Sequence, residues 1–353
     1  MSKYWSELAS SLTPYIPGEQ PQDKKVIKLN TNENPYPPSS HVLDAIKAAS
    51  DSDLRLYPDP NCTTLRQTIA AYHGLREQQV FVGNGSDEIL ALAFAALFKS
   101  TSPISFPDIT YSFYKVYAQL YNLRYELIPL DDEFNIPLDQ IHRPNGGIII
   151  PNPNAPTGKG IAVGRIEQLV AEHREQVVII DEAYIDFGGE SAVQLIKRYP
   201  NVLVVHTLSK SRSLAGLRVG VALGHEELIE GLNRVKNSFN SYTLDRLAIA
   251  GAVAAYQDEA HFIHHIQKVI HTRERTVAQL RTLGFKVIDS QANFVCMTHV
   301  EFEAETLYLA LRERGILVRH FNESRIHNYL RVSIGTDSEM DSFIEALTQL
   351  LRV

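Results

Sequence analysis

Short apolar runs alternate with longer amphipathic segments through the middle of the chain. The runs are Val80–Val82, Ile148–Ile150, Val177–Ile180 and Val202–Val205. Runs of this length, without regular polar alternation, predict strands that are buried on both faces, as in a parallel sheet. The helix-like segments between them predict the crossover connections of an α/β fold. The pattern of Arg218–Leu223 predicts one more strand, which we expect to be antiparallel.

The two ends of the chain differ from this middle part. Residues 1–38 are rich in proline, asparagine and polar groups, which predicts an extended arm and no helix. Residues 41–50 and 64–73 have helical periodicity, as do the long segments Thr243–Tyr256 and Glu259–Leu283. The remaining predicted elements are strands at Phe285–Ile288, Asn293–Met297, Ile316–Val318 and Leu330–Ile334, and helices at 303–313 and Asp337–Leu351. We therefore expect an arm (1–38), a large domain (39–245) and a small domain (246–353).

Composition and charge narrow the class of protein. The chain has 353 residues, of which 44% are hydrophobic and 21% charged, as in ordinary globular proteins. A formal net charge of −7 argues against nucleic acid or an anionic membrane as a partner. The only two cysteines, Cys62 and Cys296, suit a reducing compartment. The N-terminus has no apolar signal core, and the longest apolar run, Ile89–Phe98, is too short to span a bilayer. We expect a soluble cytoplasmic protein.

Lys210 is the first candidate for chemistry. It follows a predicted strand and lies in Thr207–Arg218, a segment rich in hydroxyl groups. Most lysines are surface residues, so Lys210 alone indicates little. Its neighbours change this, because an amine can form a Schiff base with an aldehyde while hydroxyl groups and Arg218 hold a phosphate.

A carboxylate ends another predicted strand. Asp181 directly follows the run Val177–Ile180, and Tyr184 comes shortly after it. Ligands of open α/β sheets bind outside the carboxyl ends of the strands. A carboxylate there can pair with the nitrogen of a pyridine ring and keep it protonated, while Tyr184 contacts the phenolic oxygen of that ring. The alternative is an aspartate that only caps a helix or turn.

Two glycine-containing loops complete the pattern. The strand at Val80 leads into Gly85-Ser86-Asp87 and a helix, for which we expect Ser86 to be the N-cap. Free backbone N–H groups at such a helix start bind phosphate. Glu88 stands where a dinucleotide fingerprint requires its third glycine, and a plain strand–helix connection explains the loop equally well. Asn152–Gly158 follows a strand as a proline-rich loop in which Gly158 permits a positive φ.

The ordered set of these motifs is similar to that of a known family. It comprises Gly85-Ser-Asp, Asn152-Pro-Asn-Ala-Pro-Thr-Gly158, Asp181-x-x-Tyr184, Ser209-Lys210 with Arg218, and Tyr329-Leu-Arg331-Val-Ser-Ile-Gly-Thr336. Over nearly its whole length the chain resembles the pyridoxal-phosphate aminotransferases of fold type I, which are aspartate aminotransferase-like. Three N-terminal segments resemble the histidinol-phosphate aminotransferase group within that family, namely Leu12–Gln20, Leu29–Pro38 and Leu56–Pro60. The resemblance implies a mainly parallel seven-stranded sheet between layers of helices, and a smaller α/β C-terminal domain.

The same resemblance implies the residues that bind the cofactor, pyridoxal 5′-phosphate. Lys210 would hold it as a Schiff base and later transfer the substrate proton, Asp181 would pair with its ring nitrogen, and Tyr184 would bond its phenolic oxygen. Tyr111 would stack on the ring. The phosphate would be bound by Gly85, Ser86, Asp87, Thr207, Ser209 and Arg218. Tyr57 would reach the phosphate in the neighbouring subunit, which implies a homodimer with shared active sites.

Further implied residues bind the substrate. Arg331 would hold the carboxylate of glutamate or 2-oxoglutarate, and Arg319 and Tyr15 would hold a substrate phosphate, with Asn32 beside them. The implied reaction is ping-pong amino transfer from L-histidinol phosphate to 2-oxoglutarate, which gives imidazole acetol phosphate and glutamate in histidine biosynthesis. The alternatives are an aromatic amino acid aminotransferase, a phosphothreonine decarboxylase-like enzyme, and a catalytically silent relative that only binds a ligand.

One position departs from the family pattern. Many relatives carry asparagine directly before Pro-Thr-Gly, where this chain has Ala155. Asn154 or Asn152 could supply the missing contact to the phenolic oxygen, or Tyr184 could act with little help; we assign Asn154. We expect no metal site, since the sequence has no His-Glu-x-x-His motif and no clustered thiolates.

Overall fold

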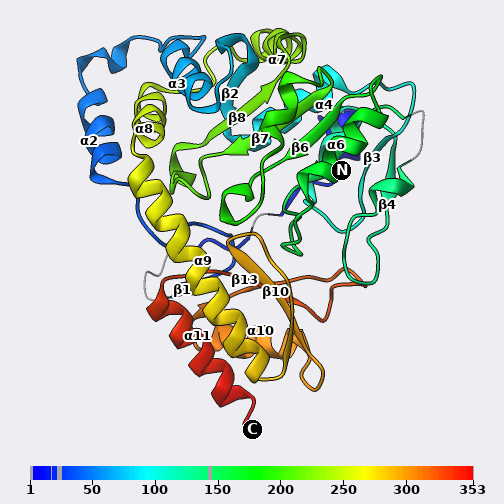
Figure 1. The fold of residues 1–353 in the computed structure, drawn as a ribbon, viewed down its shortest axis with the longest axis vertical. Helices are drawn as coiled ribbons and strands as arrows, with labels where there is room; N and C mark the ends of the chain where they lie inside the picture. Colours follow the sequence, from blue (N-terminus) through cyan, green and yellow to red (C-terminus); the bar gives the residue numbers. More distant parts are fainter. Residues whose placement is uncertain (1–2, 17, 22–25, 142–144, 353) are drawn as a thin grey trace.

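The two larger sheets lie toward opposite ends of the molecule in the computed structural model, which describes residues 3–16, 18–21, 26–141 and 145–352 (Figure 1). The larger sheet has seven strands and the smaller sheet has four. The long helix α9 (Glu259–Thr282) runs from the helices beside the large sheet toward the small one. The α/β fold predicted from the sequence is confirmed, including its seven-stranded sheet.

The large sheet is parallel except for one strand. Its order is β2-β8-β7-β6-β5-β3-β4. The strands are β2 (Val80–Asn84), β3 (Ile104–Pro107), β4 (Tyr125–Ile128), β5 (Ile148–Pro151), β6 (Val178–Asp181), β7 (Val202–Thr207) and β8 (Val219–Gly224). β8 runs antiparallel to both of its neighbours, as predicted. Since β2 pairs with β8 in the same antiparallel sense, β2 has the direction of the remaining strands.

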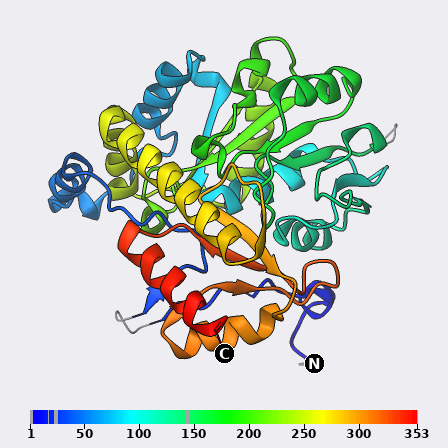
Figure 2. The same ribbon diagram turned by 60° about the horizontal axis from the view of Figure 1, so that its bottom comes forward.

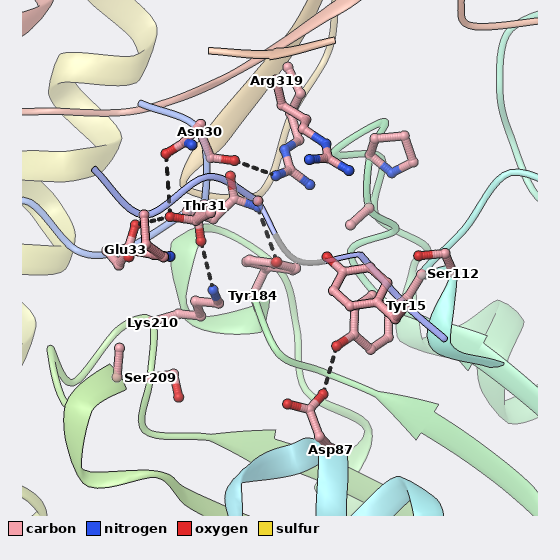
Figure 3. Close-up of a pocket in the computed structure, with 18 of the residues that line it drawn as sticks. Tyr15, Asn30, Thr31, Glu33, Asp87, Ser112, Tyr184, Ser209, Lys210 and Arg319 are labelled. Atoms are coloured by element: carbon pink, nitrogen blue, oxygen red, sulfur yellow. Dashed lines mark hydrogen bonds between the residues drawn. The ribbon is translucent and has the colours of Figure 1, made fainter. Parts of the chain in front are cut away.

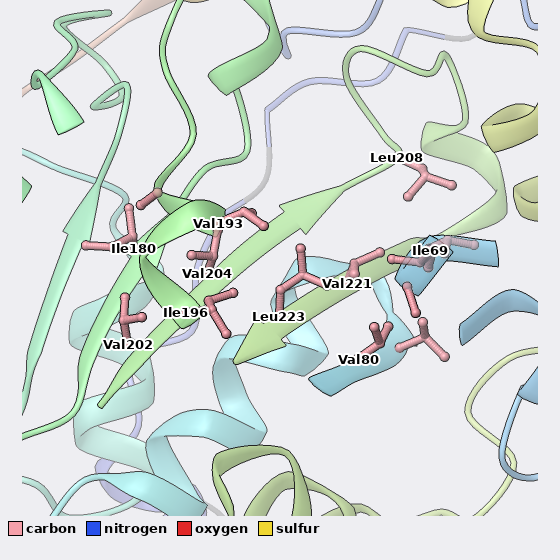
Figure 4. Packing of buried hydrophobic residues seen from close by; sticks show 14 of the residues in the cluster. Ile69, Val80, Ile180, Val193, Ile196, Val202, Val204, Leu208, Val221 and Leu223 are labelled. Carbon is pink, nitrogen blue, oxygen red and sulfur yellow. The ribbon is translucent and has the colours of Figure 1, made fainter. Parts of the chain in front are cut away.

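Successive residues of the central strands pack on opposite faces of this sheet, as a period of two requires. In β5, Ile148 and Ile150 belong to one core and Ile149 to the other. All three are fully buried. Because both faces of these strands are covered, their sequences are unbroken apolar runs. Figure 4 shows one of these cores from close by.

Helices cover both faces of the large sheet. One face is covered by residues of α2 (Ser40–Ala49), α3 (Thr63–His73), α6 (Val163–Glu172) and α8 (Arg246–Gln257). The other face is covered by α4 (Gly85–Leu97), α5 (Phe113–Leu120) and α7 (Glu226–Phe239). The 3₁₀ helices are Ser52–Arg55, Glu77–Gln79, Leu138–Gln140, Ile185–Phe187, Ala192–Lys197 and Ala215–Leu217.

The strand directions bring distant loops to one edge of the large sheet. β2, β3, β5, β6 and β7 all end at this edge, and the antiparallel β8 begins there. In register, Asp181 lies beside Pro151 of β5, and Thr207 lies beside Gly220 of β8. The segments that start at Gly85, Asp108, Asn152, Glu182 and Leu208 therefore meet at the edge where α/β sheets bind ligands.

The C-terminal part has its own core. Its sheet has the order β12-β13-β10-β9, with β9 (Phe285–Ile288), β10 (Phe294–His299), β12 (Arg319–His320) and β13 (Leu330–Ser333). The helices α9, α10 (Ala304–Glu313) and α11 (Asp337–Leu350) pack with it around a second apolar cluster. Figure 2 shows α10 and α11 on the outer side of this part. These elements confirm the strands and helices predicted after residue 240, within a few residues at each boundary.

The N-terminal segment joins this C-terminal core. β1 (Ile27–Lys28) pairs in parallel with β11 (Ile316–Leu317), and the buried Leu29 belongs to the same apolar cluster. The Leu29 carbonyl accepts a hydrogen bond from the Ser333 backbone at 2.9 Å. The residues that follow β1 are thereby held between the two sheets.

Two local predictions were wrong. Residues 1–38 contain a short helix, α1 (Glu7–Ser11), which Ser6 caps by accepting a hydrogen bond from the Ala9 N–H at 3.1 Å. Ser86 is not an N-cap, because α4 already starts at Gly85 and its N-cap is Asn84. The division into an arm (1–38) and domains (39–245 and 246–353) stays a prediction, and residues 1–2, 17 and 22–25 of the arm lie outside the described residues.

Gly220 in β8 offers a test of this packing. A Cβ atom there would lie 2.4 Å from the Gly85 carbonyl carbon and 2.5 Å from the Ser86 nitrogen. Because these are backbone atoms, we expect Gly220→Ala to destabilise the protein by about 1–3 kcal/mol. Gly164→Ala is the matched control, since nothing lies within 4 Å of its Cβ position in α6 and alanine favours helix. Urea unfolding should show loss for the first variant and no loss for the second; equal stability of both would contradict this packing.

Candidate active site

A cavity of about 600 Å³ opens at the loop-bearing edge of the large sheet and continues into a smaller one of about 120 Å³. The residues that line both are Asp87, Tyr111, Ala155, Tyr184, Ser209, Lys210 and Arg218. Figure 3 shows the larger cavity, with Lys210 and Asp87 on the side of the large sheet and Arg319 opposite. The structure thus brings together residues from five of the loops at this edge and from the C-terminal part.

Lys210 lies in the loop after β7 and lines both cavities. Its Nζ donates a hydrogen bond to the Thr31 carbonyl at 3.1 Å, which directs the amine toward the N-terminal segment (Figure 3). The same Nζ lies 5.7 Å from the centre of the Tyr184 ring.

Asp181 ends β6 and lines the smaller cavity together with Lys210. Its Oδ2 accepts a hydrogen bond from the Tyr114 hydroxyl at 2.6 Å, and its Oδ1 accepts a weaker one from the Ala183 N–H at 3.3 Å. Burial raises the pKa of Asp181 to about 6, and the nearby carboxylates of Asp87 and Glu182 act in the same direction, although the two hydrogen bonds lower it. A positive group beside Oδ1 would stabilise the charged form and so lower this pKa.

Arg218, Ser209 and Asp87 come together at the start of α4. Arg218 adopts a left-handed backbone with φ 55°, and its guanidinium contacts Asp87 Oδ2 at 3.1 Å and Ser209 Oγ at 3.4 Å. Gly85 has φ +80°, and a Cβ there would lie 2.5 Å from Arg218 Nη2, so glycine is required at this turn. The hydroxyl-bearing residues Ser86 and Thr207 line the same small cavity. Hydroxyl groups, a guanidinium and a helix N-terminus are the groups that bind phosphate.

Tyr111 forms part of the wall between these groups. Its hydroxyl donates a hydrogen bond to Asp87 Oδ1 at 2.6 Å, and burial raises its pKa well above the usual value. Asp87 therefore holds both the phenol of Tyr111 and the guanidinium of Arg218, which fixes their positions on either side of it.

Two arginines from the C-terminal part line the opposite end of the larger cavity. Arg331 lies on β13, Arg319 on β12, and Tyr15 lines the cavity beside them. Arg331 donates to the Asn30 carbonyl at 2.8 Å, while its buried Nε has no hydrogen-bond partner among the described residues. Within the described part of the chain, neither arginine has a carboxylate within 4.0 Å. Burial lowers the pKa of Arg331, and the unpaired donors are suited to an anionic ligand.

Three predicted cofactor contacts lie outside the cavity lining. Tyr57 is 78% exposed and stacks on Tyr242 with ring centres 4.6 Å apart. Asn154 is fully buried, and its amide donates to the Ile109 carbonyl at 3.0 Å and accepts from Thr110 at 3.1 Å. Gly85 lies against the Arg218 guanidinium and is not among the residues that line either cavity. The amide of Asn152 is likewise turned into its own loop, toward Ile161.

Sequence reasoning missed other residues that the fold places here. Tyr114, the donor to Asp181, lies in the first turn of α5, shortly after Tyr111, and this short spacing was the available signal. Glu33 lines the larger cavity and contacts Lys28 and Thr31 in the described structure. No pattern in the sequence indicated that Thr31 would present its carbonyl to Lys210.

The site has the groups that a phosphorylated pyridine aldehyde requires. An amine and a carboxylate line one small cavity, a tyrosine hydroxyl lies beside them, and an arginine and hydroxyl cluster occupies the start of a helix. The described residues contain no group of three or more histidine, cysteine or carboxylate side chains placed to hold a metal. Among the helices described, none is both long and apolar enough to cross a bilayer.

Fold and site together define an enzyme of the aminotransferase type. The family model for class I and II aminotransferases matches residues 24–347, and the chain belongs to this family. It is 59% identical over 351 residues to a histidinol-phosphate aminotransferase of Clostridium acetobutylicum, which covers 99% of this chain and 100% of that protein. The family recognised in the sequence is thereby confirmed.

Solved structures share the fold at lower identity. A histidinol-phosphate aminotransferase of Sinorhizobium meliloti in complex with pyridoxal-5′-phosphate has a TM-score of 0.89 and 22% identity, with 100% of this chain and 98% of that chain covered. An L-threonine-O-3-phosphate decarboxylase of Porphyromonas gingivalis has a TM-score of 0.80 and 22% identity, with 93% and 100% covered. The fold alone therefore does not separate these activities.

The raised pKa of Asp181 makes stability depend on pH in the protein without cofactor. The folded pKa of about 6 exceeds the ordinary value of 3.8. The folded state therefore binds more protons than the unfolded state between these values, and the free energy of unfolding falls as pH rises through this window. A shift of about two units corresponds to roughly 3 kcal/mol. We expect Asp181→Asn to unfold at higher urea than wild type at pH 7 but not at pH 4. A stability difference that does not grow with pH would contradict this account.

Proposed function

We propose that the protein transfers an amino group between L-histidinol phosphate and 2-oxoglutarate, with pyridoxal 5′-phosphate as cofactor. The observation that carries the proposal is the arrangement in one continuous cavity of Lys210, Asp181 and two anion sites. One anion site, at Arg218, suits the cofactor phosphate, and the other, at Arg319 and Arg331, suits a substrate phosphate or carboxylate. The 59% identity to a protein of that name supports this substrate pair.

Each residue has a defined task in holding the cofactor. Asp181 would pair with the ring nitrogen, Arg218 with Ser86, Thr207 and Ser209 would bind the phosphate, and Tyr111 would pack on the ring. When bound, the cofactor supplies an aldehyde for the amine of the substrate and a ring that withdraws electrons from the reacting carbon. Asp181 keeps that ring nitrogen protonated, because an ionised carboxylate stabilises the positive charge beside it.

Lys210 would then move the proton. With its Nζ freed by the substrate amine, Lys210 would serve as the acid–base group that takes the proton from the substrate carbon and later gives it back. The Thr31 carbonyl, 3.1 Å from Nζ, limits where the amine can lie. Reversal of the same transfers with the second substrate gives ping-pong kinetics.

The two arginines would accept both substrates in turn. Guanidinium groups bind phosphate and carboxylate with the same paired geometry. Arg331 would hold the carboxylate of glutamate or 2-oxoglutarate, and Arg319 with Tyr15 would hold the phosphate of histidinol phosphate. Both therefore supply charge that complements an anion at the far end of the cavity.

A second copy of the chain would complete the site, so we propose a homodimer. Tyr57 is too exposed for a side chain with a purely internal role, and the large apolar side chains Leu54, Leu56, Phe239 and Tyr242 are exposed with it. We infer that these side chains lie at the dimer interface, where a second copy would cover them. We further propose that the chain has a large domain (39–245) and a small domain (246–353). We also propose that the protein is cytoplasmic and has no nucleic-acid or membrane partner.

A second activity merits a direct comparison. The arginine pair suits phosphothreonine as well as histidinol phosphate, and a decarboxylase has the same fold. Side-by-side turnover of histidinol phosphate, phenylalanine and phosphothreonine, with identification of the products, distinguishes these reactions. We expect the highest kcat/KM for amino transfer from histidinol phosphate; carbon dioxide released from phosphothreonine at a higher kcat/KM would favour the decarboxylase.

Replacement of Lys210 tests its proposed role as the lysine that binds the cofactor. We expect Lys210→Ala to abolish amino transfer and the visible absorbance of bound cofactor, since among the described residues Lys210 is the lysine that lines the two cavities. Lys286→Ala, on the exposed side of β9, is the control and should behave as wild type. Amino transfer and absorbance that persist in purified Lys210→Ala would refute the assignment.

The substrate anion site gives a quantitative prediction. Loss of a charged hydrogen bond is worth about 1.5–3 kcal/mol, so Arg319→Ala should lower kcat/KM for histidinol phosphate roughly 10- to 100-fold. Arg314→Ala, an exposed arginine just after α10, should leave it unchanged. Steady-state kinetics checks both. If the two variants lost activity equally, Arg319 would have no specific role with the phosphate.

A further inference from the structure

The hydroxyl of Tyr184 has a partner from a distant part of the chain. Asn32 Nδ2 donates a hydrogen bond to it at 3.1 Å, across 152 positions of sequence. Asn32 follows β1 in the segment that joins the C-terminal core, whereas Tyr184 follows β6 of the large sheet. Figure 3 shows this hydrogen bond as the dashed line that ends at the Tyr184 hydroxyl.

Every other polar group of Asn32 is already bonded. Its backbone N–H donates to Ser333 Oγ at 2.8 Å, and Ser333 Oγ donates in return to Asn32 Oδ1 at 2.9 Å. Its carbonyl accepts from Asn293 Nδ2 at 3.0 Å. The residue is 1% exposed and has φ 58°, a left-handed conformation that requires support from its surroundings.

These bonds fix the orientation of the side-chain amide. Because Ser333 occupies Oδ1, the amide presents its NH₂ group to Tyr184. The Tyr184 oxygen therefore acts as an acceptor toward Asn32, and its own proton is left for another partner. Tyr184 lines both cavities, so a ligand bound there is within reach of that proton.

The loop 151–158 offers no side-chain amide that could share this task. Pro151, Pro153 and Ala155 line the smaller cavity without a polar side-chain atom. Asn152 and Asn154 are fully buried, and their amides are bonded inside the loop and to residues Ile109, Thr110 and Ile161. The alternative in which Asn154 or Asn152 replaces the side chain missing at Ala155 is therefore not supported by the geometry.

We propose that Asn32 is a positioning residue, held by Ser333, that fixes the Tyr184 hydroxyl as a hydrogen-bond donor to the phenolic oxygen of the cofactor. This inference rests on the proposed function, because it presumes that a pyridoxal ring occupies the smaller cavity. It assigns Asn32 to the cofactor side of the site, in place of the substrate contact expected from the sequence.

The absorbance of the bound cofactor provides a readout that does not depend on turnover. A donor to the phenolic oxygen stabilises its ionised form, and so lowers the pH at which the cofactor band shifts. Asn32→Gly removes the amide, and glycine adopts the left-handed backbone without strain. We expect this variant to raise the midpoint by about half a pH unit or more, and Tyr184→Phe to raise it by about one unit, a tenfold change.

A double mutant separates positioning from a structural role. In the Tyr184→Phe background no hydroxyl remains to be positioned, so Asn32→Gly should move the midpoint no further. Ser333→Ala should shift the midpoint in the same direction as Asn32→Gly. A change in melting temperature alone, with the wild-type midpoint, would mean that Asn32 only supports the fold.

Each outcome has a distinct meaning. If wild type binds the cofactor and titrates, but Asn32→Gly has the same midpoint, or shifts it equally with and without the Tyr184 hydroxyl, the inference is wrong and the proposed function stands. If wild type forms no absorbing complex with added pyridoxal 5′-phosphate, both are wrong.

Discussion

The buried carboxylate of Asp181 is the constraint on which the site depends. It ends a strand whose neighbours supply apolar residues on both faces, so water cannot solvate it fully, and its pKa rises to about 6. The Tyr114 hydroxyl donates a hydrogen bond to Asp181 Oδ2. Asp181 also lines the smaller cavity, together with Lys210. A protonated ring nitrogen would stabilise the ionised carboxylate in place of the water that burial excludes. Burial of Asp181 thus lowers the free energy of unfolding of the protein alone, and the same burial favours a cationic partner beside the carboxylate.

The site also joins two separately packed parts of the molecule. The large sheet supplies Lys210, Asp181 and Arg218, and the C-terminal part supplies Arg319 and Arg331. The segment after β1 lies between them: Asn30 accepts from Arg331, Thr31 from Lys210, and Asn32 donates to Tyr184. This short stretch, anchored through Leu29 to β11 and β13, therefore contacts both the proposed cofactor end and the proposed substrate end of the cavity.

Much of the fold could be predicted from the sequence because the central strands are buried on both faces. Ile148–Ile150 and Val202–Val205 are short, unbroken apolar runs, which is the pattern typical of strands in a parallel sheet. β3 and β4 were not assigned individually; β4 has an exposed stretch, Tyr125–Leu127, at the edge of the sheet, and its pattern is correspondingly weak. The short helix α1 depends on a cap at Ser6 within a polar segment, and this segment has no apolar periodicity that would predict a helix.

The residues of the site also differ in how far the sequence predicts their positions. Lys210 follows β7, Asp181 ends β6 and Arg218 directly precedes β8, so the topology places them together. Asn32 and Thr31, in contrast, reach the cavity only through pairing of the N-terminal segment with β11 and β13. That pairing joins residues about 300 positions apart and has no local signal.

The most direct test is a crystal structure of the wild-type protein with pyridoxal 5′-phosphate. The account predicts continuous density from Lys210 Nζ to the cofactor, with an Asp181 oxygen roughly 2.7–2.9 Å from the ring nitrogen. A cofactor attached to a different lysine, or a ring whose nitrogen lies away from Asp181, would contradict it.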